Sequence, residues 1–391
     1  MDFAESSAVR ESDVTLRFVI RAPLAAFCAV LLAACASPGM PPGGPVDTEA
    51  PQIVKIVPDS GKVGTTPREV IFRFDEVVNE RPSGATSLAG LFLISPRDGE
   101  PRVDWHREEI SVRPRRGWKK NVAYTITLLP GLSDLRGNTR NTGAVTMFAT
   151  GSSIPASRIT GTLFNWAEGR AVVRNGLVQA WPRTDTSLVY VTTTDSAGAF
   201  VLSTLPPAQY VVRGISDDNS NRGLDRREAW DTVAVTVADS ARVNLYGFIH
   251  DSLGTRLSSV NVRDSVTIEL VFDSPVSMAP PIGPADIRVR SPDSTDIGVV
   301  SVTPPPPDTT AAVRALGRPV PPRTLIVKLA TPVRPKSTYR VRVARITNLA
   351  GITRPGEAIL ATPATLPVPA PARPIVPPAA PPPPPPAATR R

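Results

Sequence analysis

From residue 49 onward, short runs of alternating apolar and polar side chains are separated by clusters of turn residues. The run Glu69–Phe74 keeps a strict period of two, which is the period of a strand with one buried face. Similar runs predict strands at residues 53–57, 69–74, 90–94, 109–112, 122–128 and 145–149. Short strands at this spacing, with turn residues between them, are typical of a β-sandwich.

A second copy of the same pattern lies near the C-terminus and indicates a duplicated domain. In both copies one strand ends in Phe-Asp, and a later strand with a tyrosine leads into a turn that contains glycine. The matched segments are Val70–Val78 with Thr267–Val276, and Tyr124–Asn138 with Tyr339–Gly351. The second copy is longer because Pro304–Pro322 adds a Pro-rich loop. Both copies resemble the bacterial Ig-like domains first described in S-layer proteins, which implies two Ig-like sandwiches.

A different pattern lies between the two copies. Asp195 and Gly198 predict the turn of a β-hairpin, and Phe200 and Tyr210 are expected to point inward. The surrounding segment Thr194–Val212 resembles carboxypeptidase-regulatory-like or Cna-B-like modules. That resemblance implies a small sandwich of the prealbumin type.

The expected fold is all-β: tandem antiparallel β-sandwiches in the order Ig-like, prealbumin-like, Ig-like, with disordered Pro-rich termini. The Pro/Gly tether and the hexaproline tail cannot form a core or a ladder. The expected segments are a signal peptide at 1–34, a tether at 35–48, sandwiches at 49–151, 156–246 and 247–362, and a tail at 363–391.

The start of the chain has the features of an export signal. Arg17 and Arg21 precede the apolar run Ala22–Ala34, which is too short to cross a bilayer because a spanning helix needs about 20 apolar residues. The tetrapeptide Leu32–Cys35 resembles the lipobox of bacterial lipoproteins. This implies cleavage before Cys35 and covalent lipid on its sulfur. The alternative is an ordinary secretory signal in which the cysteine is incidental.

Lipid on this cysteine implies attachment to a membrane, because several acyl chains together hold a protein there almost permanently. Ala36 follows the cysteine, where lipoproteins retained at the inner membrane usually carry aspartate. The expected location is therefore the outer membrane of a Gram-negative-type envelope. Four acidic residues precede the apolar run, which is unusual for a signal, so we expect translation to start downstream, at Val14 or Leu16.

Charge and cysteine content narrow the functional classes. The chain has 44 Lys and Arg against 35 Asp and Glu, a net charge of +9, but the basic residues are scattered along all segments. We therefore expect no nucleic-acid partner, and a solvated hairpin at the basic turn Arg113–Lys120. The two cysteines are Cys28, within the signal, and Cys35, so each domain must be stabilised by its own core rather than by disulfides.

One polar loop carries the strongest candidate site. Oxygen-bearing side chains occupy positions one, three, five, nine and twelve of a twelve-residue run, which is the spacing by which a loop surrounds a hard cation such as calcium. Glycine stands at position seven instead of six and the flanks are strands, so the loop is not an EF-hand. It resembles the calcium loops of Cna-B-like repeats, which implies structural calcium. The alternative is a polar turn whose side chains cap their own backbone. The candidate ligands are Asp217, Asn219, Asn221, Asp225 and Glu228.

Catalytic motifs are lacking in the sequence. It has two histidines, His106 and His250, and none of the familiar hydrolase or phosphate-binding motifs. Asp75 and Glu76 are neighbours on a strand and are expected to point to opposite faces. We therefore expect no catalytic residues and a protein that is not an enzyme.

The sequence as a whole predicts a membrane-anchored envelope lipoprotein that presents β-sandwiches as a structural or interaction scaffold. One alternative is an adhesin or carbohydrate-binding surface protein, which predicts an exposed aromatic patch from residues such as Trp105, Trp118, Trp166 and Trp181. Another is an accessory subunit of an envelope machine that docks through the Pro-rich tail. The expected partners are the membrane, through the lipid, and an envelope protein or a polysaccharide.

Overall fold

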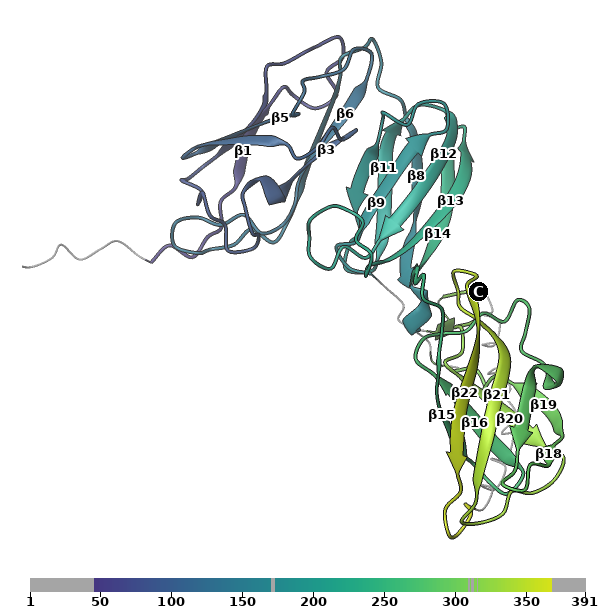
Figure 1. Ribbon diagram of the computed structural model, residues 1–391. Coiled ribbons are helices and arrows are strands. Elements are labelled where there is room, and N and C mark those ends of the chain that lie inside the picture. The colour runs from purple at the N-terminus through teal and green to yellow at the C-terminus, as the bar shows by residue number, and fades with distance from the viewer. Residues whose placement is uncertain (1–45, 170–172, 309, 311–312, 315, 368–391) are drawn as a thin grey trace, which may run out of the picture. The chain divides into compact units, whose positions relative to one another are not determined.

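The computed structural model describes residues 46–169, 173–308, 310, 313–314 and 316–367. In this part of the chain the regular structure is strand, apart from three short 3-10 helices and one helical turn at 313–314, so the predicted all-β fold is confirmed (Figure 1). No helix among these residues has the length and apolarity needed to span a membrane. The candidate lipidation site Cys35, the signal peptide and residues 368–391 of the tail lie outside the described residues.

The first sandwich has a sheet of order β1-β2-β5-β4 and a second sheet of order β3-β6-β7. The period-two run of β2 buries Val70, Phe72 and Phe74, and the ring of Phe72 meets the edge of Phe92 at 5.3 Å between centroids. The elements are β1 (Ile53–Val57), β2 (Val70–Phe74), η1 (Ala89–Leu91), β3 (Phe92–Ser95), β4 (Arg102–His106), β5 (Glu109–Arg113), β6 (Ala123–Leu128) and β7 (Ala144–Ala149).

Six of these strands were predicted, and β4 was not. Only Val103 and Trp105 in β4 are apolar, and both are just partly buried at the edge of the sheet. An edge strand with one half-buried face leaves little hydrophobic signal in its sequence. The predicted strand at 90–94 begins later, as β3, because Ala89–Leu91 forms the 3-10 turn η1.

The middle sandwich is a seven-stranded sheet of order β10-β9-β12-β13-β14-β8-β11, folded on itself. Among the described residues, two residue pairs of β13 and β14 form the strand pairing between its halves. Phe200 and Tyr210 are buried between the halves, as predicted, and Tyr210 packs edge-on against Tyr190 at 6.2 Å. The elements are β8 (Ser157–Asn165), η2 (Trp166–Glu168), β9 (Leu177–Pro182), β10 (Tyr190–Thr193), β11 (Ala199–Leu205), β12 (Ala208–Ile215), β13 (Ala229–Val237) and β14 (Ser240–Ile249).

One pairing in the middle sandwich departs from the expected antiparallel arrangement. Strands β14 and β8 are parallel, with Val243 beside Gly161. β14 follows β13 through a tight turn and therefore runs opposite to β13. This places β14 beside β8 with both strands running in the same direction, so the two strands pair parallel. Gly161 is needed at this contact, because a Cβ built there would lie 1.7 Å from the carbonyl oxygen of Val243.

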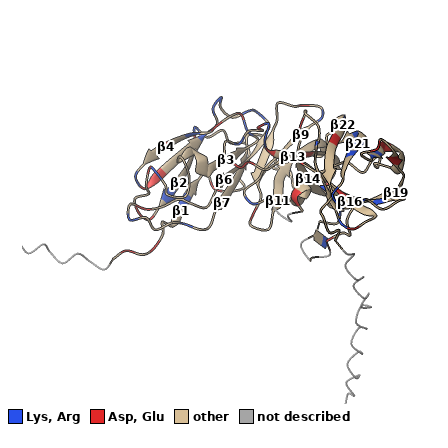
Figure 2. Cartoon of the chain, turned by 60° about the horizontal axis from the view of Figure 1, so that its bottom comes forward, with Lys and Arg blue, Asp and Glu red and all other residues tan. Residues whose placement is uncertain are grey.

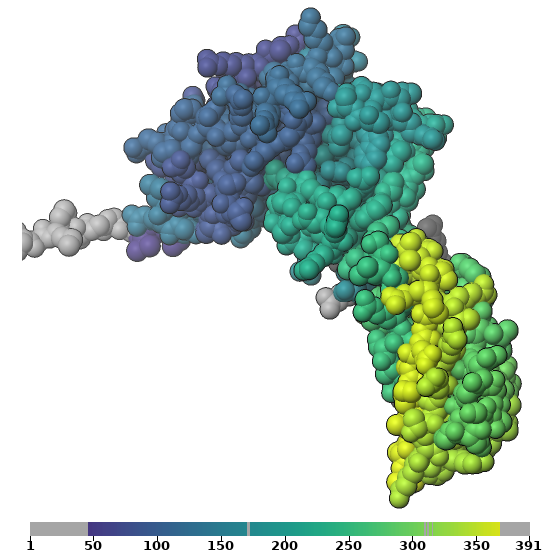
Figure 3. All heavy atoms as spheres, viewed as in Figure 1, coloured from purple at the N-terminus to yellow at the C-terminus, as the bar shows by residue number. Residues whose placement is uncertain are grey.

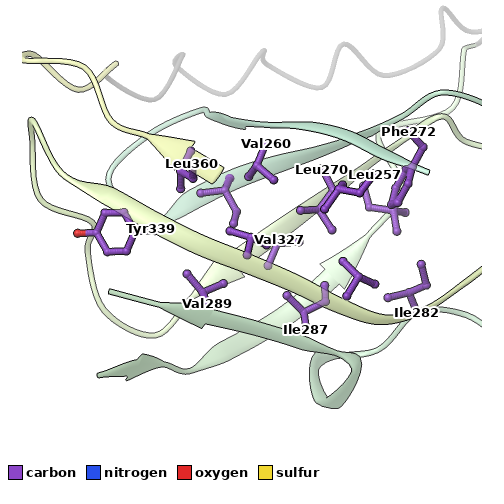
Figure 4. Packing of buried hydrophobic residues seen from close by; sticks show 14 of the residues in the cluster. Leu257, Val260, Leu270, Phe272, Ile282, Ile287, Val289, Val327, Tyr339 and Leu360 are labelled. Carbon is purple, nitrogen blue, oxygen red and sulfur yellow. The ribbon is translucent and has the colours of Figure 1, made fainter. Parts of the chain in front are cut away.

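The third sandwich pairs a sheet of order β15-β16-β20-β19 with one of order β18-β17-β21-β22. Leu270, Val327 and Tyr339 come from facing sheets and meet in its apolar core (Figure 4). The edge strand β22 lies along the surface, in yellow in Figure 3. The elements are β15 (Leu257–Val262), β16 (Thr267–Phe272), η3 (Pro284–Asp286), β17 (Ile287–Arg290), β18 (Asp296–Ile297), β19 (Val299–Thr303), β20 (Thr324–Leu329), β21 (Thr338–Thr347) and β22 (Thr353–Ala361).

The first and third sandwiches repeat the same hydrogen bonds at the matched residues. The Asp75 carboxylate accepts a hydrogen bond from the backbone N–H of Gln52 at 2.8 Å, and Asp273 does the same with Arg256 at 2.8 Å. In each copy this bond fixes the start of the first strand against the end of the second. Asp75 thus has a structural role that the second copy reproduces.

The matched tyrosines are equivalent as well. The backbone N–H of Lys119 donates to the Tyr124 hydroxyl at 2.7 Å, and the N–H of Arg334 donates to the Tyr339 hydroxyl at 2.7 Å. Both tyrosines are 2% exposed, so each buried hydroxyl has a partner from the loop five residues upstream. These repeated contacts are what two copies of one domain are expected to share.

Candidate functional site

The predicted calcium loop connects β12 and β13, which are neighbours in the sheet. Ile215 pairs with Trp230, so the intervening residues form one long hairpin connection. The strands on either side fix both ends of the loop, as the sequence indicated.

Hydrogen bonds inside the loop gather most of the candidate ligands. The side-chain amides of Asn219 and Asn221 both donate to Asp225 Oδ2, at 2.6 and 2.9 Å. The backbone N–H of Arg222 donates to Asp217 Oδ2 at 2.9 Å. The backbone N–H of Asp225 donates to an oxygen of Glu228 at 2.9 Å. The loop is therefore a polar turn that satisfies much of its own backbone.

Two carboxylate oxygens of the loop remain buried without a hydrogen-bond partner among the described residues, Asp217 Oδ1 and Glu228 Oε1. Glu228 is only 4% exposed. Burial raises the pKa of Asp217; it also raises the pKa of Glu228, to which the negative charges of Asp217 and Asp225 add. Because a buried carboxylate oxygen without a partner is costly, these two oxygens fit a hard cation that takes oxygen ligands.

The rest of the loop is not arranged around a cation. Asn219 and Asn221 direct their nitrogens, not their oxygens, toward Asp225. The carboxylates of Asp217, Asp225 and Glu228 are not gathered within 4.8 Å of one another. A bound cation would require both amides to rotate and the three carboxylates to draw together.

Arg222 points away from the candidate ligands and into the first sandwich. Its Nη1 donates to the backbone carbonyl of Phe92 at 2.6 Å, and its Nη2 donates to the carbonyl of Gly90. The guanidinium of Arg97 in turn donates to the carbonyl of Arg222. Burial lowers the pKa of Arg222, and the charge of Arg97 lowers it further. No pattern in the sequence indicated this contact, because the arginine lies within an otherwise ordinary polar loop.

Further contacts join the first and middle sandwiches. Leu93 of β3 packs in one apolar cluster with Leu177, Val191 and Ile215 of the middle sandwich. The backbone N–H of Val191 donates to the buried hydroxyl of Ser95 at 3.0 Å. The junction therefore combines apolar burial with satisfied polar groups, as a domain interior does.

The Pro-rich loop of the third sandwich covers one end of the middle sandwich. The indole Nε1–H of Trp166 donates to the carbonyl of Pro319 at 2.7 Å, and the Arg318 guanidinium lies 3.8 Å from the centre of the indole ring. The Tyr246 hydroxyl donates to the carbonyl of Leu316 at 2.8 Å. The insertion that lengthens the third sandwich relative to the first thus has a structural role.

The four tryptophans proposed for an exposed aromatic patch do not form one. Trp105 donates to the carbonyl of Val78 at 2.9 Å, and Trp118 packs edge-on against Tyr124 in the first sandwich. Trp166 is only 8% exposed. Trp181 lies on the middle sandwich beside an arginine. Large rings in small sandwiches are drawn into packing, and the sequence could not tell which of them stay exposed.

The basic turn after β5 is tied to the preceding loop. The backbone N–H groups of Arg115 and Arg116 donate to the two oxygens of Asp98, at 3.0 and 2.7 Å. Lys119 Nζ donates to the carbonyl of Ser187 at 3.0 Å. Elsewhere, basic and acidic residues are interspersed along the strands and loops (Figure 2).

Comparison with models of protein families finds a match to part of the chain. Residues 47–150 match the model of the bacterial Ig-like domain, in agreement with the first sandwich. Among curated proteins, none matches the sequence.

Several solved structures are similar at low identity. The N-terminal part of the bacterial S-layer protein SbsC is 20% identical, with a TM-score of 0.21, and the match covers 28% of this chain and 24% of that one. The Bacillus anthracis TIE protein is 11% identical over 82% of this chain and 58% of its own, with a TM-score of 0.19. BcpA, the major pilin subunit of Bacillus cereus, is 7% identical over 53% of this chain and 69% of its own, with a TM-score of 0.22. This chain thus spans less than two thirds of the first two.

Proposed function

We propose that the chain is a non-catalytic, lipid-anchored protein of the bacterial envelope, in which β-sandwiches serve as a structural or interaction scaffold. The observation that carries this proposal is the way the sandwiches are joined. Arg222 and the apolar cluster around Leu93 connect the first to the middle sandwich, and Trp166 receives the loop of the third. A scaffold that holds its binding partners at a defined distance from the membrane needs such packed, hydrogen-bonded junctions between its domains. The bacterial Ig-like domain at 47–150 agrees with this role.

The anchor is proposed at Cys35, in the lipobox-like segment of the sequence. Palmitate labelling of the protein expressed in a Gram-negative host tests it. The wild-type chain is expected to incorporate the label and to be cleaved before Cys35, and Cys35→Ser to remain unlabelled and uncleaved, since the lipid would be lost. Globomycin treatment should give the unprocessed precursor. Equal labelling of both forms would refute the anchor. Separation of inner and outer membranes then tests the proposed outer-membrane location.

Structural calcium is proposed for the loop between β12 and β13, supported by the buried unpaired oxygens of Asp217 and Glu228. Asn219, Asn221 and Asp225 would supply the remaining oxygens. Calcium should neutralise these carboxylates and stabilise the fold, by about 2.7 kcal/mol at a hundredfold excess over Kd. Its addition should raise the melting temperature and change the fluorescence of the adjacent Trp230, and chelator should reverse both.

A matched pair of variants makes the calcium test specific. Glu228→Gln should abolish the calcium-dependent stabilisation, because it removes the charge of a buried candidate ligand. Asp239→Asn, an exposed carboxylate in the turn between β13 and β14, should leave it unchanged. Magnesium is expected to stabilise the protein less than calcium does, since it demands near-ideal octahedral geometry. Equal melting temperatures with calcium and with chelator would refute bound calcium. The loop would then be a polar turn whose side chains cap their own backbone.

The alternative role, as an accessory subunit that docks through the Pro-rich tail, makes a separate prediction. A chain that ends at residue 362 should lose capture of envelope proteins if the tail carries the contact. If capture persists, the partner is bound by the sandwiches. Protease treatment of intact cells distinguishes a periplasmic from a surface-exposed orientation.

A further inference from the structure

A crevice of about 370 Å³ opens on the outer face of the middle sandwich, beside the loop that follows β3. Strands β9 and β12 form its floor, on the face opposite to the buried core. Its lining residues are Arg97, Gly99, Gln179, Trp181, Thr186, Val189 and Arg213. The lining thus combines two cations, an indole ring, an amide and a hydroxyl.

Arg213 is held in the crevice between two indole rings. Trp181 pairs with Val211 and Trp230 pairs with Ile215, so both rings lie on the same face as Arg213, two residues along β12 in either direction. The guanidinium carbon is 4.9 Å from the centre of the Trp181 ring and 5.4 Å from that of Trp230. Such stacking fixes the orientation of a guanidinium without using its hydrogen-bond donors.

The described residues offer the charge of Arg213 no carboxylate. Its Nε is buried without a hydrogen-bond partner, and its guanidinium forms no ion pair among these residues. Burial lowers the pKa of Arg213, because the charged form is partly removed from water. Arg97 donates only to the backbone carbonyls of Gly99 and Arg222. Two guanidinium groups therefore line one crevice, and no acidic residue lines it.

We propose that this crevice binds a carboxylate-bearing sugar of an anionic polysaccharide. The carboxylate would accept hydrogen bonds from Arg213 and Arg97, because guanidinium groups match a carboxylate in charge and planar geometry. Gln179 and Thr186 would bond ring hydroxyls, and the exposed part of Trp181 would contact the apolar face of the sugar.

The size and chemistry of the crevice favour a sugar over a simple anion. A volume of about 370 Å³ is within the range of small-molecule sites, and far exceeds the space that one inorganic anion needs. The apolar face of the Trp181 indole would have no use in binding phosphate alone. This site goes beyond the scaffold role and depends neither on Cys35 nor on the Pro-rich tail, so its failure would leave the anchor untouched.

Binding can be measured on the purified wild-type chain in mild detergent with tetragalacturonate as the probe. Fluorescence of Trp181 and Trp230 and titration calorimetry should both show saturable binding that weakens as salt is raised. The methyl-esterified tetramer has the same sugars without the charge and should bind at least about tenfold more weakly. Equal binding of the esterified tetramer would overturn the proposal. Equal binding of inorganic phosphate would overturn its sugar component.

Variants separate the site from general charge attraction. Arg213→Gln should weaken binding by about tenfold or more, because a charge-assisted hydrogen bond is lost. Arg213→Lys keeps the charge but lacks the planar guanidinium, so its affinity should lie between those of the wild type and Arg213→Gln. Arg158→Gln, an exposed arginine of the same sandwich outside the crevice, should bind like wild type. Circular dichroism checks that each variant folds. Unchanged affinity in folded Arg213→Gln and Arg213→Lys would refute the assignment.

Discussion

Arg222 and Phe92 lie 130 positions apart in the chain and are joined by a 2.6 Å hydrogen bond from the guanidinium to the backbone carbonyl. The same side chain donates to the carbonyl of Gly90, so one arginine satisfies two backbone acceptors of the first sandwich. Asp217 holds the backbone of Arg222 from the loop side. The candidate calcium loop is therefore mechanically coupled to the junction between two sandwiches.

Replacing Arg222 should loosen this junction. Arg222→Ala leaves both carbonyls without their donor and removes a largely buried cation, which should cost about 3 kcal/mol. We expect the first and middle sandwiches to unfold in separate transitions by calorimetry, where the wild type unfolds them together.

The neighbouring Arg226→Ala is the matched control, because Arg226 is exposed in the same loop. It should melt like the wild type. If Arg222→Ala also keeps a single transition at an unchanged temperature, the hydrogen bonds to Phe92 and Gly90 contribute nothing to the junction.

Asp134 and Asn348 occupy equivalent places in the first and third sandwiches. Each forms an isolated bridge to the valine that follows the Phe-Asp landmark, Val78 or Val276. Burial alone would raise the pKa of Asp134, but hydrogen bonds from the side chain and backbone of Asn138, together with other turn N–H groups, outweigh it and place this pKa below its usual range. The third sandwich builds the same turn with an uncharged amide.

This comparison predicts a pH-dependent contribution of Asp134 to stability. A carboxyl whose folded-state pKa is depressed stabilises the fold above its unfolded pKa of about 3.9, and the stabilisation is lost as pH falls through the folded pKa. Asp134→Asn should fold, as Asn348 does in its copy, but melt below the wild type at pH 7. The difference should close as the pH approaches 3. A difference in melting temperature that stays constant with pH would contradict this prediction. The control variant Asp239→Asn should melt like the wild type at each pH.

The strands were predictable where local pattern determines them. The alternation in Glu69–Phe74 and in Thr267–Val276 follows directly from one buried face, and the structure places β2 and β16 there. Strand β4 was not predicted, because an edge strand needs few apolar residues. The parallel pairing of β14 with β8 depends on which distant strand is nearest, which no local pattern encodes.

The candidate site was predictable only in part. The spacing from Asp217 to Glu228 located a loop with buried carboxylates, because ligand spacing within a loop is a local property. It did not indicate that Arg222 would leave the loop for another domain. The partners of Trp166 and Arg213 were equally hidden, since each comes from a distant part of the sequence or from a neighbouring strand.

Gly161 should not tolerate any side chain. A Cβ at this position would lie 1.7 Å from the carbonyl oxygen of Val243 and 2.8 Å from the ring of Phe200, so β8 and β14 would have to separate. Gly161→Ala should destabilise the middle sandwich by about 3 kcal/mol, measured by urea unfolding. Gly283→Ala is the control, since the nearest atom to its Cβ is 3.8 Å away. Equal midpoints for both variants would contradict the tight parallel pairing.

Trp166 should control the docking of the Pro-rich loop onto the middle sandwich. Trp166→Phe keeps an aromatic ring under Arg318 but loses the donor to Pro319, and should cost about 1 kcal/mol. Trp166→Ala loses the packing as well and should cost more. As the loop detaches, thermolysin should cleave near Leu316, faster in the alanine variant than in the phenylalanine one. Val201→Ala, an exposed apolar residue of the same sandwich, should be cleaved like wild type. If all four proteins are cleaved at one rate, Trp166 does not hold the loop.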